Sequence, residues 1–225
     1  STVSGGRYAR TARMGHGWAR GATGRRYSTN ARRRRTTEPP MMVCTHVAAG
    51  LVSASVVALS APGFAVPALG GAVVGGVAPD LDLFAGTHRR TLHFPDLYWL
   101  PAVGFGAIAV GRPTPVAVAA AVAALTAAVH SVSDWFGGGT ELRPWERTSP
   151  HGVYVHLTGR WLAPRHWVRY DGAPEDLLVA AVLSIPALVV YDPPVSALVV
   201  VMLVVAASYV AIRRRLPELK ERSRP

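Results

Sequence analysis

One histidine and three aspartates stand at spacings that suit metal-ion chemistry. His130 and Asp134 are four residues apart in AAVHSVSDW, so on a helix they lie on one face, one turn apart. Asp80 and Asp82 follow a proline in PDLD, where a turn can place two carboxylates on the same or neighbouring ions. Imidazole and carboxylate together suit the divalent ions of Zn, Mn or Fe. Two such ions would polarise a phosphoryl or acyl oxygen and generate hydroxide near neutral pH.

Three further histidines accompany these residues. His46 stands at the start of an apolar segment, and His88 and His93 lie in AGTHRRTLHFP. Each feature alone has a plainer interpretation, because a histidine at a helix end is usually structural or complements the helix dipole. An Asp-X-Asp sequence is likewise more often a cap or a turn. The metal-site hypothesis therefore depends on the elements that bring these residues together.

Those elements are apolar segments. Half of the residues are hydrophobic, 16% are charged and the mean hydropathy is +0.23, whereas a soluble domain carries about 25% charged residues. Several segments are shorter than the ~20 residues of a perpendicular span, and the first two, split by Ala61-Pro62-Gly63, also fit a re-entrant hairpin. We expect an all-α, polytopic membrane helical bundle of about 4–6 apolar segments. These segments have no Asp, Glu, Lys or Arg in their interiors, and they are 47–61, 64–79, 98–111, 115–133, 176–191 and 194–212.

The connections between these segments predict a topology. A hairpin and a pair of spans both return the chain to its starting side, so the N-terminus, the 80–97 loop, the 134–175 loop and the C-terminus should share one side. By the positive-inside rule that side is cytoplasmic, which predicts a multi-pass protein of the cell (inner or plasma) membrane with both termini in the cytoplasm. Arg112 alone falls opposite; the arginines on the shared side are Arg89, Arg90, Arg143, Arg147, Arg160, Arg165, Arg169, Arg213, Arg214 and Arg215.

The two ends of the chain differ from this body in composition. Residues 1–40 hold ten arginines and one acidic residue, and removing them from the chain's net charge of +11 leaves about +2. This composition predicts that residues 1–40 form a disordered arm. The arm could bind a membrane surface or a nucleic acid, or act as a basic anchor that sets the topology. Because Met41-Met42 stands where the apolar pattern begins, the arm could also be sequence upstream of the natural start codon. Nucleic-acid binding is disfavoured, because it would depend on the arm alone. We expect a membrane domain over 41–216 and a basic cytoplasmic tail over 217–225.

The order of these motifs resembles a known family. His46 at the start of the first helix, Pro79-Asp80-Leu81-Asp82, the run from His88 to His93, and His130-X-X-X-Asp134 are similar to the membrane-bound metal-dependent hydrolases. These are also described as LexA-binding, inner-membrane-associated hydrolases. The resemblance covers roughly residues 42–137 and implies metal-dependent hydrolysis without naming a substrate. Thr91-Leu92-His93 has one residue between Thr and His where the family commonly has none, so either His88 or His93 can be the family's loop histidine.

The leading hypothesis is a metal-dependent hydrolase that acts at the cytoplasmic membrane surface. Its substrate would be a small molecule or lipid headgroup, first of all a phosphate ester, with Arg89 and Arg90 orienting the anion. His88 and Asp82 are the candidate catalytic residues, His88 as a ligand or a proton donor. The predicted metal ligands are His46, Asp80, Asp82, His93, His130 and Asp134.

Two other functions remain open. The first is a non-enzymatic membrane protein with a structural metal site or a regulatory protein partner. The second, a transporter or channel, is disfavoured because such proteins keep ionisable residues near the midplane of the bilayer. In the 138–175 loop, aromatic rings alternate with His151, His156 and His166. This composition favours a belt at the level of the lipid headgroups, and a lid over the metal site is the alternative.

Overall fold

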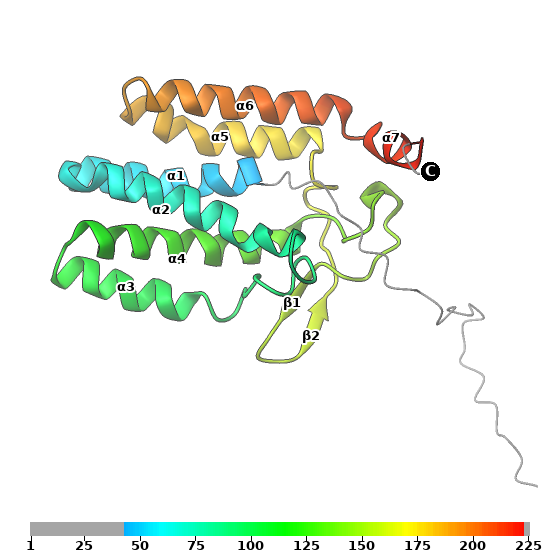
Figure 1. The fold of residues 1–225 in the computed structure, drawn as a ribbon, viewed down its shortest axis with the longest axis horizontal. Coiled ribbons are helices and arrows are strands. Elements are labelled where there is room, and N and C mark those ends of the chain that lie inside the picture. Colours follow the sequence, from blue (N-terminus) through cyan, green and yellow to red (C-terminus); the bar gives the residue numbers. More distant parts are fainter. Residues whose placement is uncertain (1–42, 223–225) are drawn as a thin grey trace, which may run out of the picture. The chain divides into compact units, whose positions relative to one another are not determined.

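The computed structural model describes residues 43–222, which form a bundle of antiparallel helices (Figure 1). The predictions for residues 1–40, and for 223–225 of the tail, lie outside the described residues. The long helices are α1 (Val43–Ser60), α2 (Ala65–Val77), α3 (Trp99–Gly111), α4 (Pro115–Ser133), α5 (Pro174–Val190) and α6 (Val195–Ile212), followed by the short α7 (Leu216–Arg222). The 3₁₀ turns are η1 (Pro62–Phe64), η2 (Ala78–Leu83), η3 (Asp134–Phe136) and η4 (Pro144–Glu146), and β1 (Val153–Val155) pairs antiparallel with β2 (Arg160–Leu162).

The predicted all-α membrane fold is confirmed. Within residues 43–222, four helical stretches are long and apolar enough to cross a membrane: Val43–Ser60, Pro62–Leu83, Pro115–Phe136 and Val195–Ile212. The six predicted segments match α1 to α6 to within a few residues at each end. The largest difference is at the first helix, which begins at Val43 instead of 47. His46 therefore lies in the first turn of α1, inside the helix and not before it.

Local sequence explains where α4, the longest helix, begins and ends. Thr114 caps its N-terminus, since the hydroxyl accepts a hydrogen bond from the Ala117 N–H, and Pro115 suits the first helical position. Alanine fills much of the helix and favours helical geometry. The α-helix ends at Ser133, and the chain tightens into η3 at Asp134. This carries both His130 and Asp134 to one end of the bundle.

Glycines allow α2 to approach α4 closely. A Cβ atom at Gly71 would collide with the Ala119 carbonyl oxygen, and one at Gly75 with the Ala123 carbonyl oxygen. In a bilayer, where apolar side chains gain little by leaving lipid, helices associate through such small residues. The α1, α2 and α4 helices are thereby packed together, and their buried apolar residues include Val47, Leu51, Ala54, Ala68, Ala72, Val118 and Val122.

The long connections gather at one end of the bundle. In Figure 1 the segments 78–98 and 134–173 and the C-terminal end of α6 lie at the right, whereas the short turns after α1, α3 and α5 lie at the left. This agrees with the prediction that the 80–97 loop and the 134–175 loop lie on the same side of the bundle. The 134–173 segment wraps onto the same end, where the Tyr154 N–H donates to the Arg89 carbonyl and the Arg213 guanidinium donates to the Asp171 carbonyl. The structure thus joins elements that are far apart in sequence around one polar region.

Candidate metal centre

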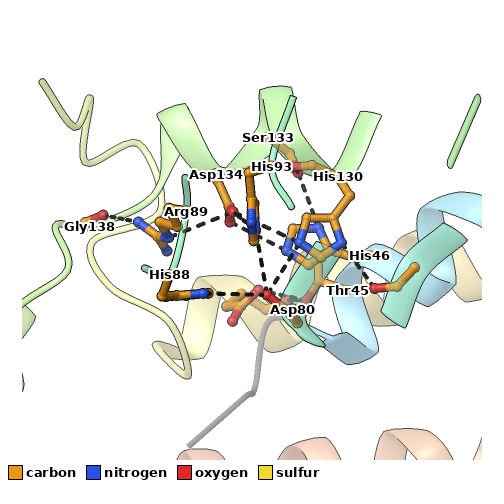
Figure 2. A network of polar contacts seen from close by, with 12 residues as sticks. Thr45, His46, Asp80, His88, Arg89, His93, His130, Ser133, Asp134 and Gly138 are labelled. Atoms are coloured by element: carbon orange, nitrogen blue, oxygen red, sulfur yellow. Dashed lines mark hydrogen bonds and ion pairs between the residues drawn. The ribbon is translucent and has the colours of Figure 1, made fainter. Parts of the chain in front are cut away.

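Seven polar side chains from five elements meet at this end of the bundle. Figure 2 labels all of them except Asp82. The first turn of α1, the η2 turn, the loop before α3, the last turn of α4 and the start of η3 each contribute. The side chains belong to His46, Asp80, Asp82, His88, His93, His130 and Asp134, the set that the sequence singled out. All except His88 are buried, and the His88 side chain is 21% exposed.

One group of potential ligands consists of His46, His130 and Asp134. Asp134 Oδ1 lies 3.4 Å from His46 Nε2, and Asp134 Oδ2 lies 3.8 Å from His130 Nε2. The two imidazole rings are stacked with their centroids 3.5 Å apart. One ligand atom from each residue lies within 4.8 Å of the others, so the group could hold a metal ion.

A second group consists of Asp80, His88 and His93, and meets the same criterion. Asp80 Oδ1 lies 3.6 Å from His93 Nε2 and 4.0 Å from His88 Nδ1. Asp80 Oδ1 is also 3.4 Å from His130 Nε2, and Asp134 Oδ2 is 2.9 Å from His93 Nε2. The two carboxylates therefore lie between the groups and face histidines of both.

Hydrogen bonds fix the proton positions of two histidines. His130 Nδ1 lies 2.9 Å from the carbonyl oxygen of Gly76, which can only accept, so Nδ1 carries a proton. Ser133 donates its hydroxyl proton to the His130 carbonyl and must therefore accept from His46 Nδ1 at 3.1 Å. In the neutral ring the lone pair is then on Nε2, and both Nε2 atoms face the carboxylates. Such secondary contacts orient metal-binding histidines.

The atoms at the middle of the cluster are close without being hydrogen-bonded. The Nε2 atoms of His46, His93 and His130 and the Oδ2 atom of Asp134 are all buried and have no aligned hydrogen-bond partner. His93 Nε2 and Asp134 Oδ2 are only 2.9 Å apart, yet their geometry is not that of a hydrogen bond. Buried polar atoms are rarely left in this state. Divalent cations bound among these atoms would satisfy all four, so the residues fit a divalent metal site.

The charge balance of the cluster also favours a cation. Three buried carboxylates, those of Asp80, Asp82 and Asp134, face one buried arginine, Arg89. The Arg89 Nε lies 3.6 Å from Asp134 Oδ2, and Nη1 donates to the Gly138 carbonyl at 2.5 Å. Burial by itself lowers the pKa of the His93 imidazole, but the carboxylates of Asp134, Asp80 and Asp82 outweigh it and raise that pKa well above its ordinary value. The site therefore attracts positive charge.

Asp82 lies in the cluster but outside both groups of three. Its two oxygen atoms lie 2.9 Å from His88 Nδ1 and from His93 Nδ1. The sequence predicted Asp82 as a ligand and left open whether His88 or His93 was the loop histidine. The structure places both histidines in the cluster, on either side of this one carboxylate.

Sequence reasoning did not find the groups that support the cluster. Gly76 is in the last turn of α2, where helix carbonyls lack intrahelical partners, so its carbonyl is available to His130. Ser133 gave no signal beyond its place between His130 and Asp134. Two histidines of the later loop contact aromatic rings instead, since His151 stacks on Trp161 and His156 packs on Phe94 and Tyr154. The third, His166, lies with its Nδ1 3.4 Å from the Arg169 carbonyl oxygen.

Comparisons of the chain with protein-family models, with curated proteins and with solved structures found no match. The buried His/Asp groups, which could hold a metal ion, and the four membrane-length helices are thus the features from which function must be inferred.

Proposed function

We propose that the protein is a membrane-embedded, metal-dependent hydrolase. The observation that carries the proposal is the convergence of three histidine Nε2 atoms and an Asp134 oxygen, buried and without aligned hydrogen bonds, at one end of an apolar helix bundle. A structural protein has little reason to bury such atoms together unless a cation binds them. The motif order that resembles membrane-bound metal-dependent hydrolases supports the same conclusion.

The side chains divide into those that hold ions and those that surround them. His46, His130 and Asp134 would hold one divalent ion of Zn, Mn or Fe, and Asp80 and His93, from the second group of Asp80, His88 and His93, would hold another. The bound ions would supply Lewis acidity that polarises a phosphoryl or acyl oxygen. His88 is the partly exposed member of the cluster, and it would either complete the second group of ligands or exchange a proton with substrate.

A phosphate ester is the substrate class that the surroundings favour. Arg89 is buried and contacts Asp134, so it contributes a fixed positive charge to the wall of the site. Arg90 is exposed, and its guanidinium lies 4.5 Å from the centre of the Tyr154 ring. It can therefore bind an anionic group from outside. Because the cluster lies at the ends of apolar helices, a lipid headgroup is within reach of such a site.

The site is proposed to face the cytoplasm, since the arginine-rich loops lie at its end of the bundle. Single cysteines placed at the exposed positions Thr87 and Pro113, in a Cys44→Ser background, would test this orientation. In intact cells a membrane-impermeant thiol reagent should label position 113 and not position 87. Labelling of both positions would refute the membrane topology, and labelling of position 87 alone would reverse the orientation.

A structural metal site in a non-enzymatic protein is the second candidate. It is favoured by the burial of all the predicted ligands, because structural sites are closed whereas catalytic ones keep a position open. His88→Ala discriminates between the two. In an enzyme the variant should keep the ion at His46, His130 and Asp134 but lose most of its turnover. In a structural site there is no turnover to lose.

The decisive experiment measures metal content and turnover together. Detergent-purified protein should contain stoichiometric divalent metal and should hydrolyse members of a panel of soluble and lipid phosphate esters, with loss of turnover on chelation and recovery on adding metal back. Metal without turnover on the panel would support the structural candidate. Purified protein that neither contains divalent metal nor binds it on titration would refute both.

A further inference from the structure

Asp82 makes contacts that differ from those of the other two aspartates. Its side chain is buried, and each carboxylate oxygen is taken by a different imidazole: Oδ1 lies 2.9 Å from His88 Nδ1 and Oδ2 lies 2.9 Å from His93 Nδ1. The Leu92 N–H also donates to Oδ2 at 3.3 Å. By contrast, Asp134 Oδ2 is buried without an aligned partner. Asp82 is thus satisfied where Asp134 is not.

These contacts determine the tautomers of two histidines. An ionised carboxylate only accepts hydrogen bonds, so His88 and His93 must each carry a proton on Nδ1. In the neutral ring the lone pair is then on Nε2. His93 Nε2 lies 2.9 Å from Asp134 Oδ2 and 3.6 Å from Asp80 Oδ1. The atom of His93 that can bind a metal ion therefore faces the cluster because Asp82 holds the other nitrogen.

The same arrangement recurs at the other two buried histidines. His130 is held through Nδ1 by the Gly76 carbonyl, and His46 through Nδ1 by the Ser133 hydroxyl. Each of the three buried imidazoles therefore donates from Nδ1 to an acceptor outside the centre of the cluster and directs its Nε2 toward that centre. Asp82 is that acceptor for His93, a charged group where the others have neutral ones. A charged acceptor raises the basicity of a metal-binding imidazole further than a neutral one does.

We infer that Asp82 is a positioning residue, not a metal ligand, and that this one carboxylate orients His88 and His93 together. This inference rests on the proposed metal site. Asp82 Oδ2 already accepts hydrogen bonds from His93 and Leu92, and Asp82 lies outside both groups of potential ligands.

The test compares Asp82→Asn with Asp80→Asn in the full-length, detergent-purified protein. Asparagine has the shape of aspartate, but its nitrogen only donates, so one of the two imidazoles must change its tautomer. With Co²⁺ as the probe, Asp82→Asn should keep the number of bound ions and the visible absorption bands of the wild type, with an affinity about 10- to 100-fold lower. Asp80→Asn should lose an ion or shift the bands, because it alters the ligand set.

The outcomes separate the two proposals. Asp82→Asn with wild-type affinity, or with the lost ion or shifted bands expected of Asp80→Asn, would overturn the positioning role while leaving the metal site standing. Wild-type protein that binds no Co²⁺ would instead overturn the proposed function. If Asp82→Asn does not fold, ¹⁵N-histidine NMR of the Zn²⁺-loaded wild type decides. His93 should be bound through Nε2 and protonated at Nδ1, and binding through Nδ1 would overturn the inference.

Discussion

The helices α1, α2 and α4 form one part of the bundle, and α5 and α6 form a second part with a different role. The α1, α2 and α4 helices pack closely through small residues. Together with η2, the loop after it and η3, they hold all seven residues of the cluster. The α5 and α6 helices supply none of them. In the apolar stretch that contains α4, 44% of the residues are buried, against 17% in α6. Close packing and the polar cluster therefore occur together, because a metal site needs ligands that are held rigidly.

The second part has a supporting role at the same end of the bundle. Arg213, at the end of α6, is buried, and its Nε donates to the Asp171 carbonyl at 3.1 Å. Its guanidinium also lies 5.4 Å from the centre of the Trp145 ring. The α6 helix thus fastens the 134–173 segment, whose Gly138 carbonyl receives Arg89. The α6 helix therefore contacts the segment beside the cluster, whereas α1, α2 and α4 position the cluster itself.

The largest effect is expected from His130→Ala, which removes a potential ligand from the tightly packed part. Turnover should fall by about 10³-fold or more, since metal ions contribute several kcal/mol to transition-state stabilisation and each 1.4 kcal/mol is a factor of ten. Metal analysis should show the loss of at least one ion. His151→Ala, which removes a histidine stacked on Trp161 outside the cluster, is the control and should change neither quantity. Equal losses of turnover and metal in both variants would contradict the assignment of the metal ions to the cluster.

Gly75→Ala should break the close approach of α2 and α4. The added Cβ would meet the Ala123 carbonyl oxygen and lie 2.7 Å from Thr126 Cβ, so the helices must separate. We expect a loss of about 1–3 kcal/mol in the free energy of unfolding, the usual range for an overfilled core. Metal affinity should fall as well, because the neighbouring Gly76 carbonyl holds His130.

The matched control for Gly75 lies on the same helix. A Cβ at Gly70 has nothing within 4 Å, so Gly70→Ala should be neutral or stabilise the helix by up to about 1 kcal/mol. Unfolding in detergent, followed by circular dichroism, measures both variants. If Gly70→Ala and Gly75→Ala behave alike, the contact between α2 and α4 is not what makes the first part of the bundle rigid.

Arg213→Ala tests the second part and should have a more local effect. The loss of one hydrogen bond and of the contact with Trp145 should cost about 1–2 kcal/mol. Protection from hydrogen exchange should fall in the 134–173 segment and stay unchanged in α2 and α4. The exposed Arg215→Ala is the control. A fall in protection that spreads to α2 and α4 would mean that the two parts of the bundle are not separable.

The sequence predicted the helices and most of the cluster for identifiable reasons. Apolar runs bounded by prolines defined the segments. Because each pair of segments returns the chain to its starting side, the long loops were predicted to lie at one end. The prediction that His130 and Asp134 lie on one face held although Asp134 begins η3 and does not continue α4. Asp134 Oδ2 is still 3.8 Å from His130 Nε2. These are local properties, and local properties can be read from residue order.

The remaining features depend on contacts across the bundle. No pattern links Gly76 to His130, since their hydrogen bond spans 54 residues and requires α2 and α4 to be packed. The sequence also could not distinguish the proposed ligand Asp80 from the proposed positioning residue Asp82. Both stand in the same short motif, and they differ only in which side chains they face. The sequence placed Arg213 only among the arginines on the cytoplasmic side of the bundle. Its burial was not predicted, because it depends on contacts with Trp145 and Asp171 in the 134–173 segment.

The smallest effect is expected at the entrance to α5. Arg169 makes two hydrogen bonds to the Glu175 carboxylate, at 2.7 Å and 2.9 Å, but the Arg169 side chain is half exposed. Exposed ion pairs of this kind contribute little to stability and are screened by salt. Arg169→Ala should therefore lower the free energy of unfolding by less than Arg213→Ala does at low salt, and by less still at high salt. Metal content should not change. A salt-independent loss as large as that of Arg213→Ala would mean that this helix entrance, like Arg213, holds the 134–173 segment in place, and Arg169 would then belong with Arg213 among the residues that support that segment.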